Sequence, residues 1–139
     1  MNEAEIHQLI GERKFPEAAD RCRQWIASTP VLPMPHALLG WCLFNQGDFA
    51  GAASSLHRAK CLDPHLWRVA IPLAQSYIQL QKFNEAYETV EDALREQPND
   101  RTLRALRTQL EPHYHGRKER WELNQRVETR VRMAGEEDD

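Results

Sequence analysis

Residues 33–64 read PMPHALLGWCLFNQGDFAGAASSLHRAKCLDP, and this stretch decides the fold. We expect a first helix to end at the polar turn Gln46-Gly47-Asp48, a second to begin at Phe49, and Pro64 to stop the second. Connections this short join helices that lie side by side. The stretch therefore predicts one antiparallel helix pair.

The pattern recurs along the chain at one fixed interval, which we call the repeat period. It aligns three phenylalanines, three alanines and three prolines: Phe15, Phe49 and Phe83; Ala18, Ala52 and Ala86; Pro30, Pro64 and Pro98. The same shift aligns Gly40 with Ala74 and Leu39 with Leu73, so that small residues align with small ones and large residues with large ones. An isolated helix pair leaves an apolar face exposed, and stacking covers it. We therefore predict an all-α fold of stacked helix pairs.

The repeated residues resemble the tetratricopeptide repeat family over roughly 100 positions. The resemblance implies a short right-handed α-solenoid with repeats at 1–32, 33–66 and 67–100, and residues 1–112 as one unit. The first repeat departs most from the pattern, because Trp25 stands where the other two have alanine. The resemblance is specific for the fold and not for a function, since function belongs to the site on the scaffold.

Three prolines predict where the first helices of the second and third repeats begin. Proline is tolerated at the start of a helix and breaks its interior at about 3 kcal/mol. Pro72 therefore predicts that its helix begins late, near Ala70 or Ile71. Pro33 and Pro35 predict that the helix of the second repeat begins only near Pro35, after an irregular connection.

The chain beyond residue 100 continues in helical pattern without the period. Leu103, Leu106 and Leu110 share one face of a predicted capping helix at 101–112. Residues 113–139 predict a basic helix that carries Arg126, Arg130 and Arg132 and ends in an acidic, disordered tail. Two interpretations remain: a solvated helix whose cations complement an acidic body, which we favour, or a contact for an acidic partner or nucleic acid.

Composition excludes several classes of protein. A formal charge of −3 and 41% hydrophobic residues predict a globular protein that neither binds nucleic acid nor enters a membrane, and we expect a cytoplasmic location. Cys22, Cys42 and Cys61 lack a CxxC pairing and predict reduced, packed thiols without a metal. His113-Tyr114-His115 lacks a third ligand or an acid, so we predict no enzyme, no catalytic or metal site, and no cofactor.

The resemblance also implies where a partner binds. In this family the first helices of successive repeats line a concave groove, and ligands usually lie there. The matching positions predict a groove that is apolar at its centre and polar at one end: His7, Met34, Leu38, Trp41, Asn45, Arg68, Gln75 and Gln79. Trp41 is the expected anchor, unless the connection before its helix or the N-terminal segment packs over it.

These positions predict a protein-interaction module, either an adaptor or scaffold or a chaperone, that binds a peptide or an amphipathic helix of another protein. One subfamily clamps the carboxylate of chaperone tails with lysine, asparagine and arginine. The matching positions here are Glu3, His7, Leu38, Arg68 and Pro72, so only Arg68 fits and we reject this clamp. A small bacterial secretion chaperone and self-association through an uncovered repeat end remain as alternatives.

Overall fold

The computed structural model describes residues 3–114, 126, 129, 130 and 132. Within these residues all regular structure is helical, which confirms the predicted all-α fold. The elements, in chain order, are α1 (Glu3–Gly11), α2 (Phe15–Ser28), α3 (Pro33–Asn45), α4 (Phe49–Leu62), the 3₁₀ turn η1 (Trp67–Val69), α5 (Ala70–Gln79), α6 (Phe83–Glu96), α7 (Arg101–Leu110) and the 3₁₀ turn η2 (Glu111–His113).

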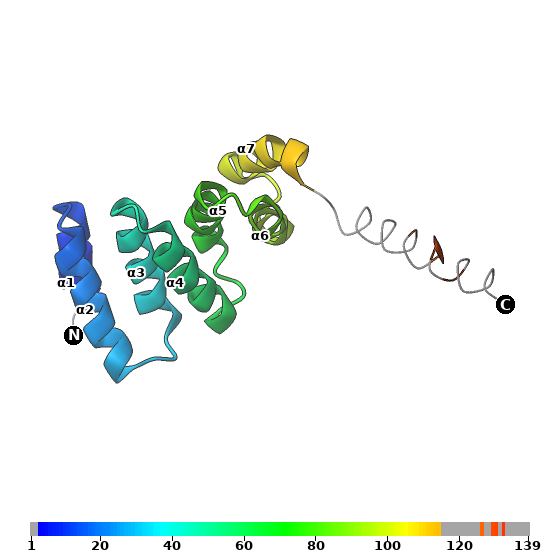
Figure 1. The fold of residues 1–139 in the computed structure, drawn as a ribbon. Helices are drawn as coiled ribbons and strands as arrows, with labels where there is room; N and C mark the ends of the chain where they lie inside the picture. Colours follow the sequence, from blue (N-terminus) through cyan, green and yellow to red (C-terminus); the bar gives the residue numbers. More distant parts are fainter. Residues whose placement is uncertain (1–2, 115–125, 127–128, 131, 133–139) are drawn as a thin grey trace.

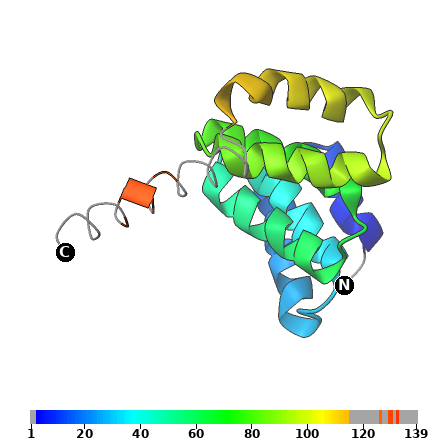
Figure 2. The same cartoon turned by 90° about the vertical axis from the view of Figure 1, so that its right-hand side faces the viewer.

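The helices form a stack in which each packs against the next one along the chain (Figure 1). The pairs α1–α2, α3–α4 and α5–α6 follow one another, and α7 covers α6 at the end of the stack (Figure 2). This order of contacts is that of a helical repeat, in which neighbours bury the face that each pair alone would expose. No helix among the described residues is long and apolar enough to cross a membrane.

The turns inside the three helix pairs share one backbone feature. Arg13, Gly47 and Gln81 have φ angles of 61°, 81° and 60°, and successive members of this set are one repeat period apart. This left-handed conformation costs a residue with a Cβ about 1–2 kcal/mol, and glycine little. The same turn therefore forms three times, although only the second repeat supplies glycine for it.

The paired helices α3 and α4 approach closely at Gly40. A Cβ added there would lie 2.5 Å from Cγ of Leu56, a side chain that is fully buried. The alanine at the equivalent place of the third repeat, Ala74, is fully buried as well. A small residue at this position therefore sets the distance between the helices of a pair.

The core runs through the whole stack as two clusters of buried side chains that meet at α5. The first joins α1 to α5 and includes Ile6, Cys22, Leu56 and Leu73. The second joins α5 to α7 and includes Val90, Leu103, Leu106 and Leu110. Tyr77 of α5 packs against both clusters and so connects the core of the first helices to that of the last.

Two expectations about local structure need correction. The helix of the second repeat begins at Pro33 and not near Pro35, because the missing N–H of each proline falls in the first turn, where it has no intrahelical partner. The late start of α5 at Ala70 is confirmed. All three cysteines are free, but Cys61 is exposed rather than packed, with its Sγ 3.5 Å from His57 Nε2.

The other two cysteines behave as packed thiols. Cys22 of α2 and Cys42 of α3 are both fully buried, at the junction between the first and second helix pairs. The neighbouring Cys42 thiol and burial raise the pKa of Cys22 well above its ordinary value. The Cys22 thiol therefore stays protonated and acts as a small apolar side chain of the core.

Candidate functional site

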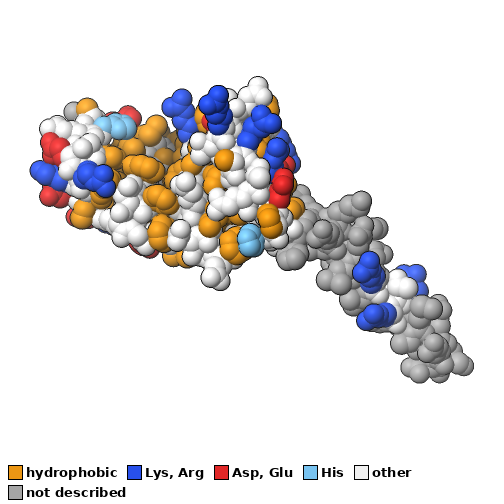
Figure 3. Space-filling model, turned by 90° about the horizontal axis from the view of Figure 1, so that it is seen from above, with side chains coloured by type: hydrophobic (Ala, Val, Ile, Leu, Met, Phe, Trp, Pro, Cys, Tyr) orange, Lys and Arg blue, Asp and Glu red, His pale blue; other side chains and the backbone are white. Residues whose placement is uncertain are grey.

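An open hollow of about 220 Å³ lies between α3 and the start of α5, and we call it the apolar hollow. Its lining residues come from α3, α4, η1, α5 and the connection before η1, and all but one are apolar: Met34, Ala37, Leu38, Trp41, Leu56, Leu66, Arg68, Val69 and Pro72. In the space-filling view hydrophobic side chains gather in a hollow between the N-terminal helices and a group of basic side chains (Figure 3).

The α3 wall of the apolar hollow is a stripe of three side chains. Met34, Leu38 and Trp41 are four and three residues apart, which places them on one face of the helix. Met34 is 37% exposed and Trp41 is 40% exposed, although both are large and apolar. The other exposed large apolar residues of the described chain, Val31 and Leu32, lie in the connection just before α3.

Aromatic packing holds the Trp41 ring in place. Trp41 stacks on Phe44, with ring centroids 5.8 Å apart and planes 12° apart. Phe44 in turn meets the edge of Phe49, the first residue of α4, at 5.6 Å. With 40% of its surface exposed, Trp41 is only partly covered by the described residues. The Trp41 indole therefore packs against Phe44 on one side, lines the apolar hollow, and is still partly exposed to solvent.

The opposite wall is formed by Arg68, Val69 and Pro72 of η1 and α5. The Arg68 guanidinium lies over the Trp67 ring, 5.5 Å from its centroid, a cation–π contact. Arg68 is exposed, and it is the only charged residue among those that line the hollow. A single cation thus stands at the edge of an otherwise apolar surface.

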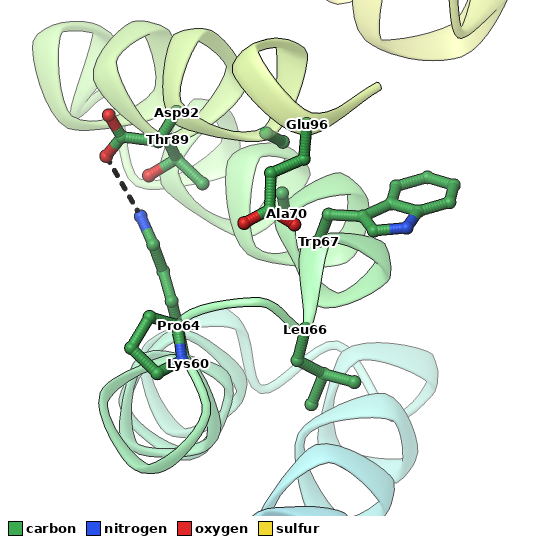
Figure 4. A pocket seen from close by; sticks show the side chains of 9 residues that line it. Lys60, Pro64, Leu66, Trp67, Ala70, Thr89, Asp92 and Glu96 are labelled. Atoms are coloured by element: carbon green, nitrogen blue, oxygen red, sulfur yellow. Dashed lines mark hydrogen bonds and ion pairs between the residues drawn. The ribbon is translucent and has the colours of Figure 1, made fainter.

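Contacts between α4, α6 and the connection to η1 position this wall. The Asp63 carboxylate accepts a hydrogen bond from the backbone N–H of His65 at 3.1 Å, and His65 Nδ1 lies 2.8 Å from Glu96 Oε1. Lys60 Nζ bridges α4 to α6 through Asp92 Oδ2 at 3.3 Å (Figure 4). Lys60, Asp92 and Glu96 also line a second, much smaller pocket (Figure 4), and Leu66 lines both that pocket and the apolar hollow.

The pKa of His65 is raised by its hydrogen bond to Glu96 and by the charge of that carboxylate. The imidazolium form of His65 is therefore favoured. At pH values below the raised pKa, the charged pair of His65 and Glu96 links the connection before η1 to α6. Because the side chain of His65 is 85% exposed, the tie is weak.

Four of the eight residues predicted for the groove line the apolar hollow: Met34, Leu38, Trp41 and Arg68. The other four lie elsewhere on the first helices. His7 Nε2 lies 3.2 Å from Glu3 Oε1 on α1, and the Asn45 side chain donates a hydrogen bond to the Trp41 carbonyl at 2.8 Å. Gln75 is half-buried and Gln79 exposed on α5.

Sequence reasoning missed the remaining lining residues. Ala37 is one turn from Met34 and Trp41, so helical spacing alone could have found it. Leu56 comes from the second helix of the pair, and Leu66 from an irregular connection with no pattern to follow. Val69 lies in η1. Pro72 indicates from the sequence where its helix begins and occupies a clamp position, and its ring also lines the apolar hollow.

The basic residues predicted as a second contact are described only in part. Arg126, Arg130 and Arg132 are helical and exposed. Most of residues 113–139, for which a basic helix and an acidic tail are predicted, lie outside the described residues.

The conspicuous histidine and tyrosine cluster before that helix packs against α6. His113 stacks on Phe83 with centroids 4.6 Å apart, and Tyr114 stacks on Tyr87 at 3.9 Å. His115 lies outside the described residues. Across the part of the chain that the structure describes, no three His, Cys, Asp or Glu side chains gather closely enough to hold a metal ion.

The structure is that of an α-helical repeat protein. Antiparallel helix pairs are stacked, one turn geometry recurs at every repeat period, and a capping helix lies at the end. Residues 43–110 match the family model described as a tetratricopeptide repeat. This matched segment carries tetratricopeptide repeats.

Solved structures with this fold cover most of the chain. The first tetratricopeptide domain of Spaghetti (RPAP3), bound to the HSP90 peptide SRMEEVD, has a TM-score of 0.76 at 20% identity, covering 80% of this chain and 88% of that one. The second such domain of human RPAP3, in complex with the HSP70 peptide SGPTIEEVD, has a TM-score of 0.75 at 16% identity, covering 78% and 91%. The Arabidopsis OM64 domain has a TM-score of 0.76 at 14% identity, covering 80% and 92%.

These likenesses confirm the helical-repeat fold. A search among curated proteins finds no match.

Proposed function

We propose that this protein is a protein-interaction module that binds a peptide or a helix of another protein in the apolar hollow, as an adaptor or scaffold or as a chaperone. The observation that carries the proposal is the exposed stripe of Met34 and Trp41 on α3. Monomeric proteins seldom leave clustered large apolar side chains in water, and such clusters mark interaction sites. A tryptophan held in a concavity is the residue type that dominates binding energy.

The dimensions of the apolar hollow favour a polypeptide segment over a small molecule. Small-molecule pockets usually measure about 300–1,000 Å³ and bury most of their ligand, whereas this hollow measures about 220 Å³ and is open. A peptide or helix can insert two or three side chains and leave its backbone at the surface.

Similar domains support the binding of a peptide, and this chain differs from them in the residues available. The two RPAP3 domains hold the peptides SRMEEVD and SGPTIEEVD. Here the positions that would hold such an acidic tail include Leu38 and Pro72, which line the apolar hollow and carry no charge. We therefore propose a partner other than these chaperone tails.

Affinity capture from an extract of the source cells, with partners identified by mass spectrometry, tests the proposal. Wild type is compared with the double variant Met34→Ala, Trp41→Ala and with Gln75→Ala, which changes the position one repeat period after Trp41. We expect a partner that wild type and Gln75→Ala retain and the double variant loses. Circular dichroism should show the same helix content in all three.

Retention of the same partners by the double variant would show that the apolar hollow is not the site. The exposed Arg126, Arg130 and Arg132 would then be the next surface to test, with an acidic protein or nucleic acid as the partner. Loss of binding at high salt would support that outcome. We propose no catalytic role, and a cytoplasmic location stays a prediction.

A further inference from the structure

We propose that the partner segment combines bulky apolar side chains, which enter the apolar hollow, with an adjacent acidic side chain that pairs with Arg68. This inference rests on the proposed function and adds the chemistry of the partner. The acidic group belongs to a side chain within the segment and not to the end of a chain.

The apolar part of the inference follows from the shape of the α3 wall. Met34 and Trp41 are seven residues apart, so the stripe is about 10 Å long at 1.5 Å per residue. Two turns of a helix or three residues of an extended strand have this length. Because every lining residue other than Arg68 is apolar, the segment must bring apolar side chains of its own over this distance.

The acidic part follows from the position of Arg68. A segment that covers the apolar hollow also covers the edge where this guanidinium stands, and it strips water from it. An arginine that loses its water without a counter-charge costs much of the binding energy gained elsewhere. Its planar fork of N–H donors matches a carboxylate better than any neutral group.

The described part of the chain does not supply that carboxylate. No acidic residue lines the apolar hollow, and no ion pair joins Arg68 to another described residue. The acids on the neighbouring face of α6 already have partners, Glu96 with His65 and Asp92 with Lys60. We therefore assign the counter-charge to the segment that binds.

A single guanidinium also distinguishes between two sources of the acid. The carboxylate at the end of a chain needs several cations or amides around it, and Leu38 and Pro72 offer none. A glutamate or aspartate side chain can reach one exposed arginine at the edge while its neighbours insert into the hollow. A basic segment is excluded because it would place like charges side by side.

Selection from a random library of linear peptides displayed on phage, with the full chain as bait, tests the inference. The peptides are displayed by their C-terminal end, so that no free carboxylate terminus can be selected. The baits are wild type, Trp41→Ala, Arg68→Glu and the matched control Gln75→Ala.

We expect wild type and Gln75→Ala to enrich peptides with clustered large apolar residues next to Glu or Asp. A synthetic, C-terminally amidated peptide from this set should bind Arg68→Glu about tenfold more weakly than wild type. Replacing its acid by lysine should reverse that preference. This reversal separates a charge pair from a general loss of packing at Arg68.

Two other results would overturn the inference, and they are distinguishable. Peptides that need Trp41 but show no acidic preference, or that bind Arg68→Glu equally well, refute the charge pair and leave the proposed function standing. Peptides that bind Trp41→Ala as well as wild type, or a selection that enriches no peptide, refute the apolar hollow as a binding site and the inference with it.

Discussion

Residues 29–45 and 63–79 contain the first helices of the second and third pairs with the connections before them, and they are related by the repeat period. Their buried positions are alike. Positions that are exposed in the second repeat differ in the third: Val31, Met34 and Trp41 correspond to the exposed His65 and Arg68 and the half-buried Gln75. One segment shows apolar side chains to solvent, and the other shows polar and charged ones.

This difference shows which part of a repeat the fold controls. Helices can pack at one distance only if the residues between them keep their size, so the buried positions vary little. The exposed positions carry no such demand and can differ between repeats of one chain. The apolar hollow lies where the two kinds of surface meet, with α3 as the apolar wall and Arg68 at the edge of the other.

The largest effect should come from truncating the equivalent buried leucines, Leu73→Ala and Leu39→Ala. Leu73 is fully buried and Leu39 is 8% exposed, and both belong to the first core cluster. Removing a buried leucine side chain costs about 2–5 kcal/mol through lost burial and the cavity left behind. Chemical denaturation of both variants should show losses of free energy of unfolding in this range.

Both losses should fall in this range if the repeats share one packing scheme. A Leu39→Ala variant as stable as wild type would show that Leu39 contributes little to the packing of α3. The second and third repeats would then not share one packing scheme. The half-buried residue Gln75, changed to alanine, is the control and should stay within about 0.5 kcal/mol of wild type.

The sequence was sufficient to predict the fold because residues with the same structural role recur at the repeat period. Phe49 is half-buried, Ala52 is buried, and the exposed Pro64 stops the second helix; each has counterparts one period before and after. The late start of α5 at Ala70 could likewise be predicted, since Pro72 breaks the interior of a helix. These predictions rest on local chemistry and on packing that every repeat shares.

Only some of the residues that line the candidate site could be predicted, and the reason for this is also physical. Met34, Leu38 and Trp41 lie on one helix face, which spacing reveals. Leu66 and Val69 reach the apolar hollow from a connection and a 3₁₀ turn, whose course depends on contacts such as His65 with Glu96. Nor does the pattern show that Cys61 is exposed, because the period says nothing about how much each neighbour covers.

A smaller effect should come from the turns that follow the two segments, where Gly47 and Gln81 share a positive φ. Gln81→Gly removes the strain of a side chain in the left-handed region and should raise the free energy of unfolding. The gain is limited to about 1 kcal/mol, because glycine also has more conformational freedom in the unfolded chain. Gly47→Ala should lower it by about 1–2 kcal/mol.

Thermal denaturation, followed by circular dichroism, measures both turn variants. The two changes have opposite sign only if the turns share one geometry in solution. If Gln81→Gly is destabilising, the Gln81 side chain contributes more through its contacts than its backbone strain costs. The turn of the third repeat would then differ from that of the second, and the comparison would need to be limited to the helices.

The smallest effect should come from the connections themselves, where Val31 and His65 are equivalent. The pKa of His65 is raised by Glu96, so the folded protein binds a proton more tightly than the unfolded chain. The stabilisation is fully present below the unfolded pKa of about 6.5 and is lost as pH rises through the raised value. His65→Asn should therefore be less stable than wild type near about pH 5.5 and equal to it near about pH 9.

Urea denaturation at these two pH values measures the difference, and two further variants locate its source. Glu96→Gln should remove the same pH dependence, because it removes the charge that holds the proton. Val31→His should not create it, since the position one repeat period before Glu96 is Leu62, which carries no charge. A pH dependence unchanged in His65→Asn would assign the proton to another group, and the connection before α5 would then be held by Asp63 and by Lys60 with Asp92.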